Sequence, residues 1–236
     1  MRMPLVGRFV LALSILLISP FCALAQKTTP PFPRDGATKV QDNDRVFTWD
    51  TTLQKGKSTG MNKLDLDQVS VSLTEGAMKI TRPDGAWEIE QQRLGSVHFN
   101  PKGTVLEEEC VSDMPCRQMV FQLKDYVPDP WPTREGIPGQ FPRINTVKLF
   151  DTDRFTVWDQ TWKPGEPIVR HAHYHRTVTV FLQGGTIHTI ADNGTVNPPF
   201  TRYPGEVLAN VTNNPEAHVE EGLLGNPRAI WIEFTK

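Results

Sequence analysis

Three histidines stand at alternate positions in the second half of the chain, and their type and spacing suit metal chemistry. His171, His173 and His175 precede the segment 178–182, whose β-branched residues are typical of a strand. Alternate residues of a strand share one face, so the three imidazoles are predicted to point the same way. Neutral imidazoles that converge on one point are ligands for a transition metal.

The elements that must position these histidines are predicted to be short strands. Apolar runs rich in β-branched residues alternate with Gly, Pro, Asn and Asp along the chain, and turn signals recur at 83–85 and 192–194. The segment that follows Tyr126 is rich in proline, which neither a helix nor a central strand accommodates. We expect it to be a connector that packs along the surface through Trp131 and Phe141.

The chain also matches itself, which indicates a duplication. Residues 47–85 align without gaps onto 156–194, and the match keeps a Trp-Asp pair, several glycines and the apolar alternation. The predicted organisation is a signal peptide at 1–25, a Pro-rich arm at 26–39, a first β domain at 40–125, a Pro-rich connector at 126–147 and a second β domain at 148–236.

The N-terminal segment has the pattern of a secretory signal peptide. Arg2 and Arg8 precede an apolar run, and Ala23-Leu24-Ala25 follows as a cleavage site. The run is too short to span a bilayer, and a retained anchor is the weaker alternative. We therefore expect a periplasmic or secreted protein with no membrane span.

The charge balance bears on the class of partner. Lys and Arg number 25 against 27 Asp and Glu, a net charge of −2. Nucleic-acid binding calls for a basic patch or stripe, which this balance does not suggest. A small molecule is the expected partner instead.

Two cysteines remain once the expected cleavage removes Cys22. Polar and turn-forming residues separate Cys110 from Cys116, between two strand-like runs. An even pair in an oxidising compartment favours a disulfide, here interpreted as a staple across a hairpin. Two free thiols, or two metal ligands without a second cysteine pair, are the alternatives.

With these motifs in place, the C-terminal half resembles the cupin superfamily, and the chain after residue 25 resembles a bicupin. The first cupin motif reads Gly, five residues, His-x-His, a short spacer, Glu, six residues and Gly. Gly165, His171, His173 and Gly184 fit this spacing, with Thr177 at the glutamate position. The resemblance implies an all-β fold of two tandem cupin barrels, also described as jelly rolls or double-stranded β-helices.

The second cupin motif centres on Pro-Gly-Asp/Glu and ends in a ligand histidine. Here Pro-Gly-Glu at 204–206 is followed by His218, slightly later than usual. The resemblance therefore implies His171, His173 and His218 as metal ligands. The implied cofactor is a divalent transition metal, foremost Fe(II), with Mn, Ni, Cu or Zn as alternatives.

Other polar residues near the motif have open roles. His175 shares the predicted face, so it is a candidate fourth ligand, a catalytic acid or base, or an exposed strand residue. Thr177 is a poor metal ligand beside a carboxylate, and it and His188 are candidates to line the pocket. Glu220 and Glu221 have counterparts at Glu107-Glu108, which favours a structural role for them.

The N-terminal half lacks the ligands, so the resemblance implies a degenerate cupin there. The residues aligned with the ligand positions His171, His173, Thr177 and His218 are Asn62, Leu64, Gln68 and Val105. This half is expected to serve as a scaffold without metal.

Three functions follow from the resemblance. The first is a three-His, metal-dependent enzyme that acts on a small, anionic metabolite with dioxygenase-like chemistry, in which His175 supplies acid/base catalysis. The second is a non-catalytic module that binds or senses a small molecule or metal. The third is a structural bicupin, and cupins as a family also lead us to expect a homodimer.

Overall fold

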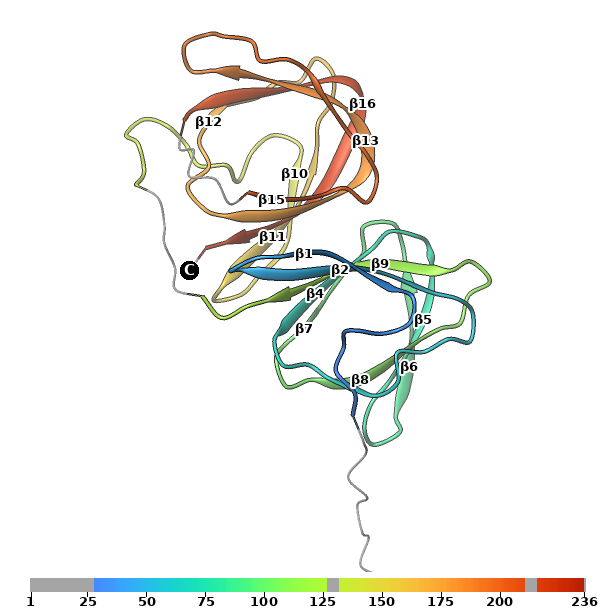
Figure 1. Cartoon of the computed structure of the whole chain (residues 1–236). Coiled ribbons are helices and arrows are strands. Elements are labelled where there is room, and N and C mark those ends of the chain that lie inside the picture. Colours follow the sequence, from blue (N-terminus) through green and yellow to red (C-terminus); the bar gives the residue numbers. More distant parts are fainter. Residues whose placement is uncertain (1–27, 127–131, 211–215, 236) are drawn as a thin grey trace, which may run out of the picture.

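The computed structural model describes residues 28–126, 132–210 and 216–235, and within these ranges it is all-β with no helix (Figure 1). The predicted signal peptide, Cys22 and Trp131 lie outside the described residues. Within those ranges, no helix is long and apolar enough to cross a bilayer. The strands form two barrels, one from each half of the sequence, as the duplication predicts (Figure 1).

The first barrel consists of a five-stranded sheet, in the order β1-β2-β9-β4-β7, and a four-stranded sheet, in the order β3-β8-β5-β6. Short strands suit this sequence because turn-forming residues interrupt its apolar runs every few positions. The strands are β1 (Ala37–Asp42), β2 (Val46–Leu53), β3 (Asn62–Lys63), β4 (Asp67–Ser72), β5 (Gly76–Thr81), β6 (Trp87–Gln92), β7 (Val97–Asn100), β8 (Val105–Cys110) and β9 (Cys116–Leu123).

The second barrel is one seven-stranded sheet, in the order β10-β11-β16-β13-β14, with β12 paired to β16 and β15 paired to β13. Its strands are β10 (Thr146–Asp151), β11 (Phe155–Thr161), β12 (Ile168–His171), β13 (Thr177–Ala191), β14 (Phe200–Arg202), β15 (Val207–Asn210) and β16 (His218–Phe234). The pairing of β13 with β16 shifts register near Gly185. A Cβ atom there would lie 2.6 Å from the Leu224 carbonyl oxygen, so only glycine allows this close approach.

The two barrels repeat each other in detail. The first strand pair of each carries a register shift, between Lys39 and Gln41 in one and between Lys148 and Phe150 in the other. Each barrel also has an equivalent ion pair, Arg117 to Asp50 at 2.6 Å and Arg228 to Asp159 at 2.7 Å. The matching register shifts support the duplication independently of the sequence match, and the ion pairs show that the repeated Asp residues have the same role in both barrels.

The largest hydrophobic cluster lies between the barrels rather than inside either one. It combines buried side chains of the five-stranded sheet with those of the second barrel: Val46, Val69, Val71, Met119, Phe121, Leu123, Phe155, Val157, Val178, Val180, Leu182, Ile230, Ile232 and Phe234. Fully burying one such side chain contributes about 2 kcal/mol. The shared cluster therefore couples the two barrels, and we expect them to unfold together.

Strand alternation assigns the opposite face of these strands to the barrel interiors. In β4, Val69 and Val71 belong to the shared cluster, so Ser70 faces the interior of the first barrel. In β13, Val178 and Val180 belong to the shared cluster, whereas Phe181 packs in a second cluster inside the second barrel. The first barrel thus has a polar interior beside β4, and the second has an aromatic one.

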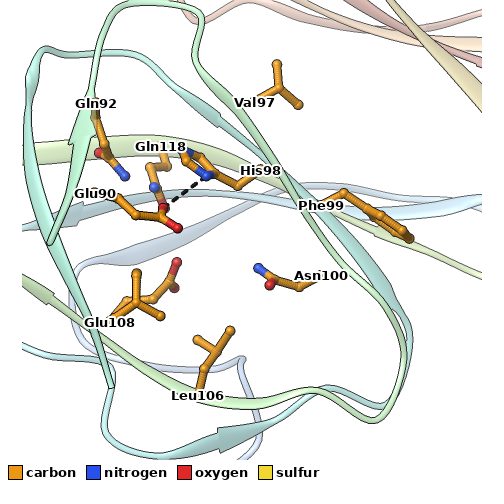
Figure 2. Close-up of a pocket in the computed structure, with 10 residues that line it drawn as sticks. Glu90, Gln92, Val97, His98, Phe99, Asn100, Leu106, Glu108 and Gln118 are labelled. Atoms are coloured by element: carbon orange, nitrogen blue, oxygen red, sulfur yellow. Dashed lines mark ion pairs between the residues drawn. The ribbon is translucent and has the colours of Figure 1, made fainter. Parts of the chain in front are cut away.

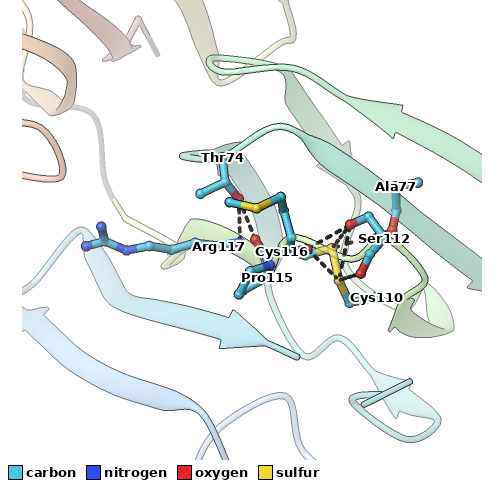
Figure 3. The surroundings of a disulfide bond; sticks show 8 residues. Thr74, Ala77, Cys110, Ser112, Pro115, Cys116 and Arg117 are labelled. Atoms are coloured by element: carbon cyan, nitrogen blue, oxygen red, sulfur yellow. Dashed lines mark hydrogen bonds between the residues drawn. A yellow bond between two sulfur atoms is a disulfide. The ribbon is translucent and has the colours of Figure 1, made fainter. Parts of the chain in front are cut away.

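The predicted disulfide is present, between Cys110 at the end of β8 and Cys116 at the start of β9 (Figure 3). The prediction that it staples a hairpin is wrong, because β8 and β9 belong to different sheets and do not pair. The bond instead closes the corner where the chain passes from one sheet of the barrel to the other. The Ala77 carbonyl oxygen lies 3.4 Å from the Cys116 sulfur.

The composition of the Pro-rich connector predicts a path along the surface, but part of the connector enters the second barrel. Phe141 stacks on Trp158 at 5.0 Å and contacts Trp231, so its ring belongs to the aromatic interior of the second barrel. Gln140 is buried and its amide donates to the His175 carbonyl at 3.0 Å. The connector therefore supplies part of the wall of the second barrel.

Candidate metal centre

Four side chains of the second barrel converge at one point: His171, His173, His218 and Glu220. One ligand atom from each lies within 4.8 Å of all the others. The Glu220 Oε1 atom is 3.7 Å from Nε2 of His173 and 3.4 Å from Nε2 of His218. Imidazole nitrogens with a carboxylate oxygen form a donor set that suits divalent transition metals. These residues could therefore hold such an ion.

Strand pairing explains how residues far apart in the sequence meet here. β12 pairs with β16 so that His171 lies opposite His218 and Ile168 lies opposite Glu220. Directly opposed residues of an antiparallel pair have neighbouring side chains, and the rings of His171 and His218 are 4.6 Å apart. Glu220 follows His218 by two positions in β16, so it lies on the same face.

Strand alternation accounts for the positions of the three neighbouring histidines only in part. β12 ends at His171, and the backbone after Ala172 is irregular until β13 begins at Thr177. His173 nevertheless turns inward, with its Nε2 atom 3.3 Å from that of His171. His175 is not in the converging group. The alternation ends with the strand, and this residue lies half-buried beside the connector through backbone contacts with Gln140.

Hydrogen bonds to backbone carbonyls orient two of the three rings. The Nδ1 atom of His171 is 2.9 Å from the Val169 carbonyl, and that of His218 is 3.1 Å from the Glu216 carbonyl. A carbonyl can only accept, so Nδ1 must carry the proton and Nε2 presents its lone pair to the centre. Such second contacts fix the tautomer that a metal ligand requires.

Arg143 of the connector also reaches the centre, and its side chain is only 3% exposed. Its Nη1 atom is 2.8 Å from Nε2 of His171 and 3.4 Å from Glu220. Its Nε donates to Gln160 at 2.9 Å, and the guanidinium lies 5.4 Å from the Trp231 ring. The Nη2 atom is buried with no hydrogen-bond partner among the described residues. The guanidinium therefore retains one unused donor at the edge of the ligand group.

The electrostatics favour the protonation states that metal binding needs at His173 and Glu220, whereas His218 must release a proton that the Glu220 carboxylate favours. Burial lowers the pKa of His173 to about 4, so its imidazole is neutral at physiological pH. Burial alone would raise the pKa of Glu220, but Arg143 and the three imidazoles hold it well below its ordinary value. Burial also opposes protonation of His218, yet the Glu220 carboxylate raises its pKa overall. A neutral imidazole and a charged carboxylate are the ligand forms that bind divalent ions.

The two predicted pocket residues occupy different environments. Thr177 is buried at the start of β13, and its hydroxyl has no hydrogen-bond partner among the described residues. His188 does not line the interior, because it pairs with Glu221 at 2.7 Å on the face opposite Glu220. Its neighbour Ile187 lines the interior cavity instead. That prediction rested on position along the sequence alone, without the facing of the strand.

Glu220 and Arg143 are the members of the site that the sequence reasoning missed. The structural role predicted for Glu220 is real, since the Trp162 indole donates to its Oε2 at 2.7 Å, but its Oε1 faces the histidines. Glu220 follows His218 by two positions in a strand, and this spacing could have placed the two side chains on one face. Arg143 had none, because its place in the barrel depends on the path of the connector.

The strand register also corrects the sequence alignment of the two halves by one residue. Asn62 lies opposite Leu106 in the first barrel, as His171 lies opposite His218 in the second. The counterpart of His218 is therefore Leu106 rather than Val105. It follows that Glu108 corresponds to Glu220, and both carboxyl groups are buried inside their barrels.

No protein-family model matches this chain, and no curated protein sequence matches it. Solved structures do resemble it. A cupin 2 conserved barrel domain protein from Leptotrichia buccalis covers 84% of this chain and 88% of its own, with a TM-score of 0.54 and 12% identity. Protein Ylba from E. coli covers 89% and 87%, with a TM-score of 0.57 and 13% identity.

A variant of oxalate decarboxylase from Bacillus subtilis is similar over 85% of this chain and 72% of its own, with a TM-score of 0.56 and 12% identity. At these identities the likeness concerns the fold. It extends across both barrels, because each match covers most of the chain. This chain therefore has the fold of a cupin-domain protein, present as two tandem barrels.

Proposed function

We propose that this chain is an exported cupin whose second barrel is a metal-dependent enzyme for a small anionic metabolite. The observation that carries the proposal is the convergence of three imidazoles and the Glu220 carboxylate inside that barrel. Fe(II) is the first candidate, with Mn, Ni, Cu and Zn as alternatives, because geometry and availability decide between these ions. A divalent ion held there would supply Lewis-acid and redox chemistry, including chemistry with dioxygen.

Two arginines support an anionic substrate. The unused Nη2 donor of Arg143 lies at the ligand group, and Arg202 lines the adjoining cavity with a buried Nε that also has no partner within the described ranges. A divalent ion beside Arg143 would leave excess positive charge even if both nearby carboxyl groups, Glu220 and Glu233, were ionised. A small carboxylate would balance this charge, and each arginine can donate to its oxygens.

The walls of this cavity are suited to excluding water. Trp162, Phe181 and Trp231 line it together with Glu220. Apolar walls strengthen the interaction between a bound anion and the arginines, because they lower the local dielectric. His173 remains neutral and Glu220 charged, so neither changes its proton when the anion enters. The acid/base role predicted for His175 is not part of this proposal, since its ring is outside the group.

A non-catalytic binding module is the second candidate, and one observation favours it. The cavity beside Glu220 holds only about 80 Å³, which leaves little room for a substrate larger than a few atoms.

A homodimer is a further proposal. It is supported by the edge strand β10, where Val147 and Leu149 are exposed. Export is proposed from the signal-peptide pattern of residues 1–25 and is checked by N-terminal sequencing of the purified protein.

Metal content tests the main proposal. We expect elemental analysis to find a stoichiometric first-row metal in the purified chain, its loss in His173→Ala, and its retention in His188→Ala. The control removes a histidine of the same barrel that lies on the opposite face. Product formation from small carboxylates, oxalate among them, then separates an enzyme from a binding module. Equal metal content in both variants, or none in the wild type after reconstitution, would refute the metal centre.

A further inference from the structure

The interior of the first barrel contains a cavity of about 230 Å³, although this half lacks the cupin ligands. Figure 2 shows that its walls carry many polar side chains, which come from four strands: Glu90, Gln92, His98, Asn100, Glu108 and Gln118. Water occupies about 30 Å³ per molecule in the liquid, so the cavity has room for several waters or one small metabolite.

Several buried polar atoms around this cavity have no hydrogen-bond partner within the described ranges. They include Oε1 of Gln92 and Nε2 of His98 on its wall. Ser70 and Ser72, which alternate with residues of the shared hydrophobic cluster, also have unpartnered hydroxyls. A buried polar atom left without a partner costs about 1–3 kcal/mol, so these atoms are expected to have partners in solution.

The charged groups of the cavity lie near groups of opposite sign. Nδ1 of His98 lies 3.0 Å from Glu90 Oε2 (Figure 2). Glu108 is fully buried, and the nearby Arg34 is close enough for the two charges to interact. Burial raises the pKa of Glu108 toward its neutral form. Its counterpart Glu220 in the second barrel has the opposite shift, because Arg143 and three imidazoles surround it.

These features select one class of ligand. The paired charges of His98 and Glu90 give no advantage to an anion, and the Glu90 carboxylate would repel one. An apolar molecule would leave the unpartnered atoms unsatisfied. A hydroxyl group both donates and accepts, so it can bind the acceptor of Gln92 and either form of His98 Nε2.

We propose that the first barrel binds a small, neutral, polyhydroxylated molecule, a monosaccharide or polyol, between Gln92, His98 and Glu108. The half of the chain that lost the metal ligands is then a second binding site rather than only a scaffold. This site is separate from the metal centre and does not depend on the function proposed for it.

Saturation-transfer NMR and calorimetry on the full chain in EDTA test this site. The probes are D-glucose, D-galactose, D-mannose and myo-inositol, with acetate and D-glucuronate as anionic comparisons, each at about 10 mM, where a ligand of millimolar Kd fills most of a site. We expect saturable binding of at least one neutral probe. EDTA and a parallel measurement on His173→Ala keep the metal centre out of the result.

Two adjacent glutamines of β6 provide matched variants. Gln92 is 3% exposed and lines the cavity, whereas Gln91 is exposed on the other face. Gln92→Leu removes the unpartnered acceptor and is expected to weaken binding by about tenfold or more, while Gln91→Leu leaves it unchanged. Asn100→Leu is the second cavity variant if Gln92→Leu does not fold. The proposal is overturned if no neutral probe binds, if only the anions bind, or if both glutamine variants bind alike.

Discussion

The buried pair of Arg143 and Glu220 provides the sharpest test of how the second barrel is held together. Its nearest atoms are 3.4 Å apart, and the two side chains are 3% and 9% exposed. At an effective dielectric constant of about 20, the Coulomb energy at this distance is about 5 kcal/mol. Removing one partner also leaves a buried charge unpaired, for which losses of about 3–5 kcal/mol are typical.

We therefore expect Arg143→Leu and Glu220→Gln each to destabilise the metal-free protein by about 3–5 kcal/mol. The double variant should lose less than the sum, by about 2 kcal/mol or more, since the second substitution removes a charge that the first left unpaired. Glutamine at position 220 keeps an oxygen that can accept from the Trp162 indole. That choice limits the effect of the substitution to the lost charge.

Urea unfolding in EDTA, followed by tryptophan fluorescence, gives the four free energies of the cycle. Equal m-values across the variants are required for the comparison. The control is the exposed pair of Arg82 and Glu88, whose side chains are 56% and 52% exposed, substituted in the same way. Its coupling should stay below about 1 kcal/mol. A coupling between Arg143 and Glu220 no larger than this control would refute the reasoning.

Two further predictions concern stability. The Cys110→Ser/Cys116→Ser variant should lose about 2 kcal/mol of unfolding free energy, because the bond closes a short loop of sequence separation 6. Chemical denaturation measures this loss, and reduction of the wild type should reproduce it. Unchanged stability would contradict the prediction. Burial raises the pKa of Glu233 to about 7, above its ordinary 4.5. Between these values the folded state keeps a proton that the unfolded chain has released, so this group makes stability fall as pH rises, by up to about 1.4 kcal/mol per unit. Glu233→Gln should flatten that slope relative to the exposed control Glu88→Gln, and parallel pH profiles would argue against it.

The strands and their repetition were predictable from local pattern. Alternation of apolar and polar residues identifies a strand within a few positions, and the repeated Trp-Asp pairs identify equivalent strands in both halves. The matching Arg117–Asp50 and Arg228–Asp159 ion pairs agree with that reading. Such signals survive in one sequence because they depend on neighbours along the chain.

The face of the sheet on which a side chain lies was predictable only within an uninterrupted strand. His171 and His218 meet because two strands pair at that register, and no local pattern encodes the pairing. The alternation that would have included His175 stops when β12 ends. His188 was misplaced for a related reason, since its strand changes register near Gly185 before reaching it.

The sequence by itself determined that the chain is a duplicated, all-β protein with a histidine cluster in its second half and one disulfide. Only the tertiary structure decided that Arg143 enters the second barrel, that Glu220 joins the histidines, and that the first barrel has a polar cavity around Glu108. The physical reason is that hydrophobic alternation acts between near neighbours, whereas burial, charge pairing and cavities depend on which distant segments pack together. The equivalent buried residues Glu108 and Glu220 therefore have pKa shifts of opposite direction.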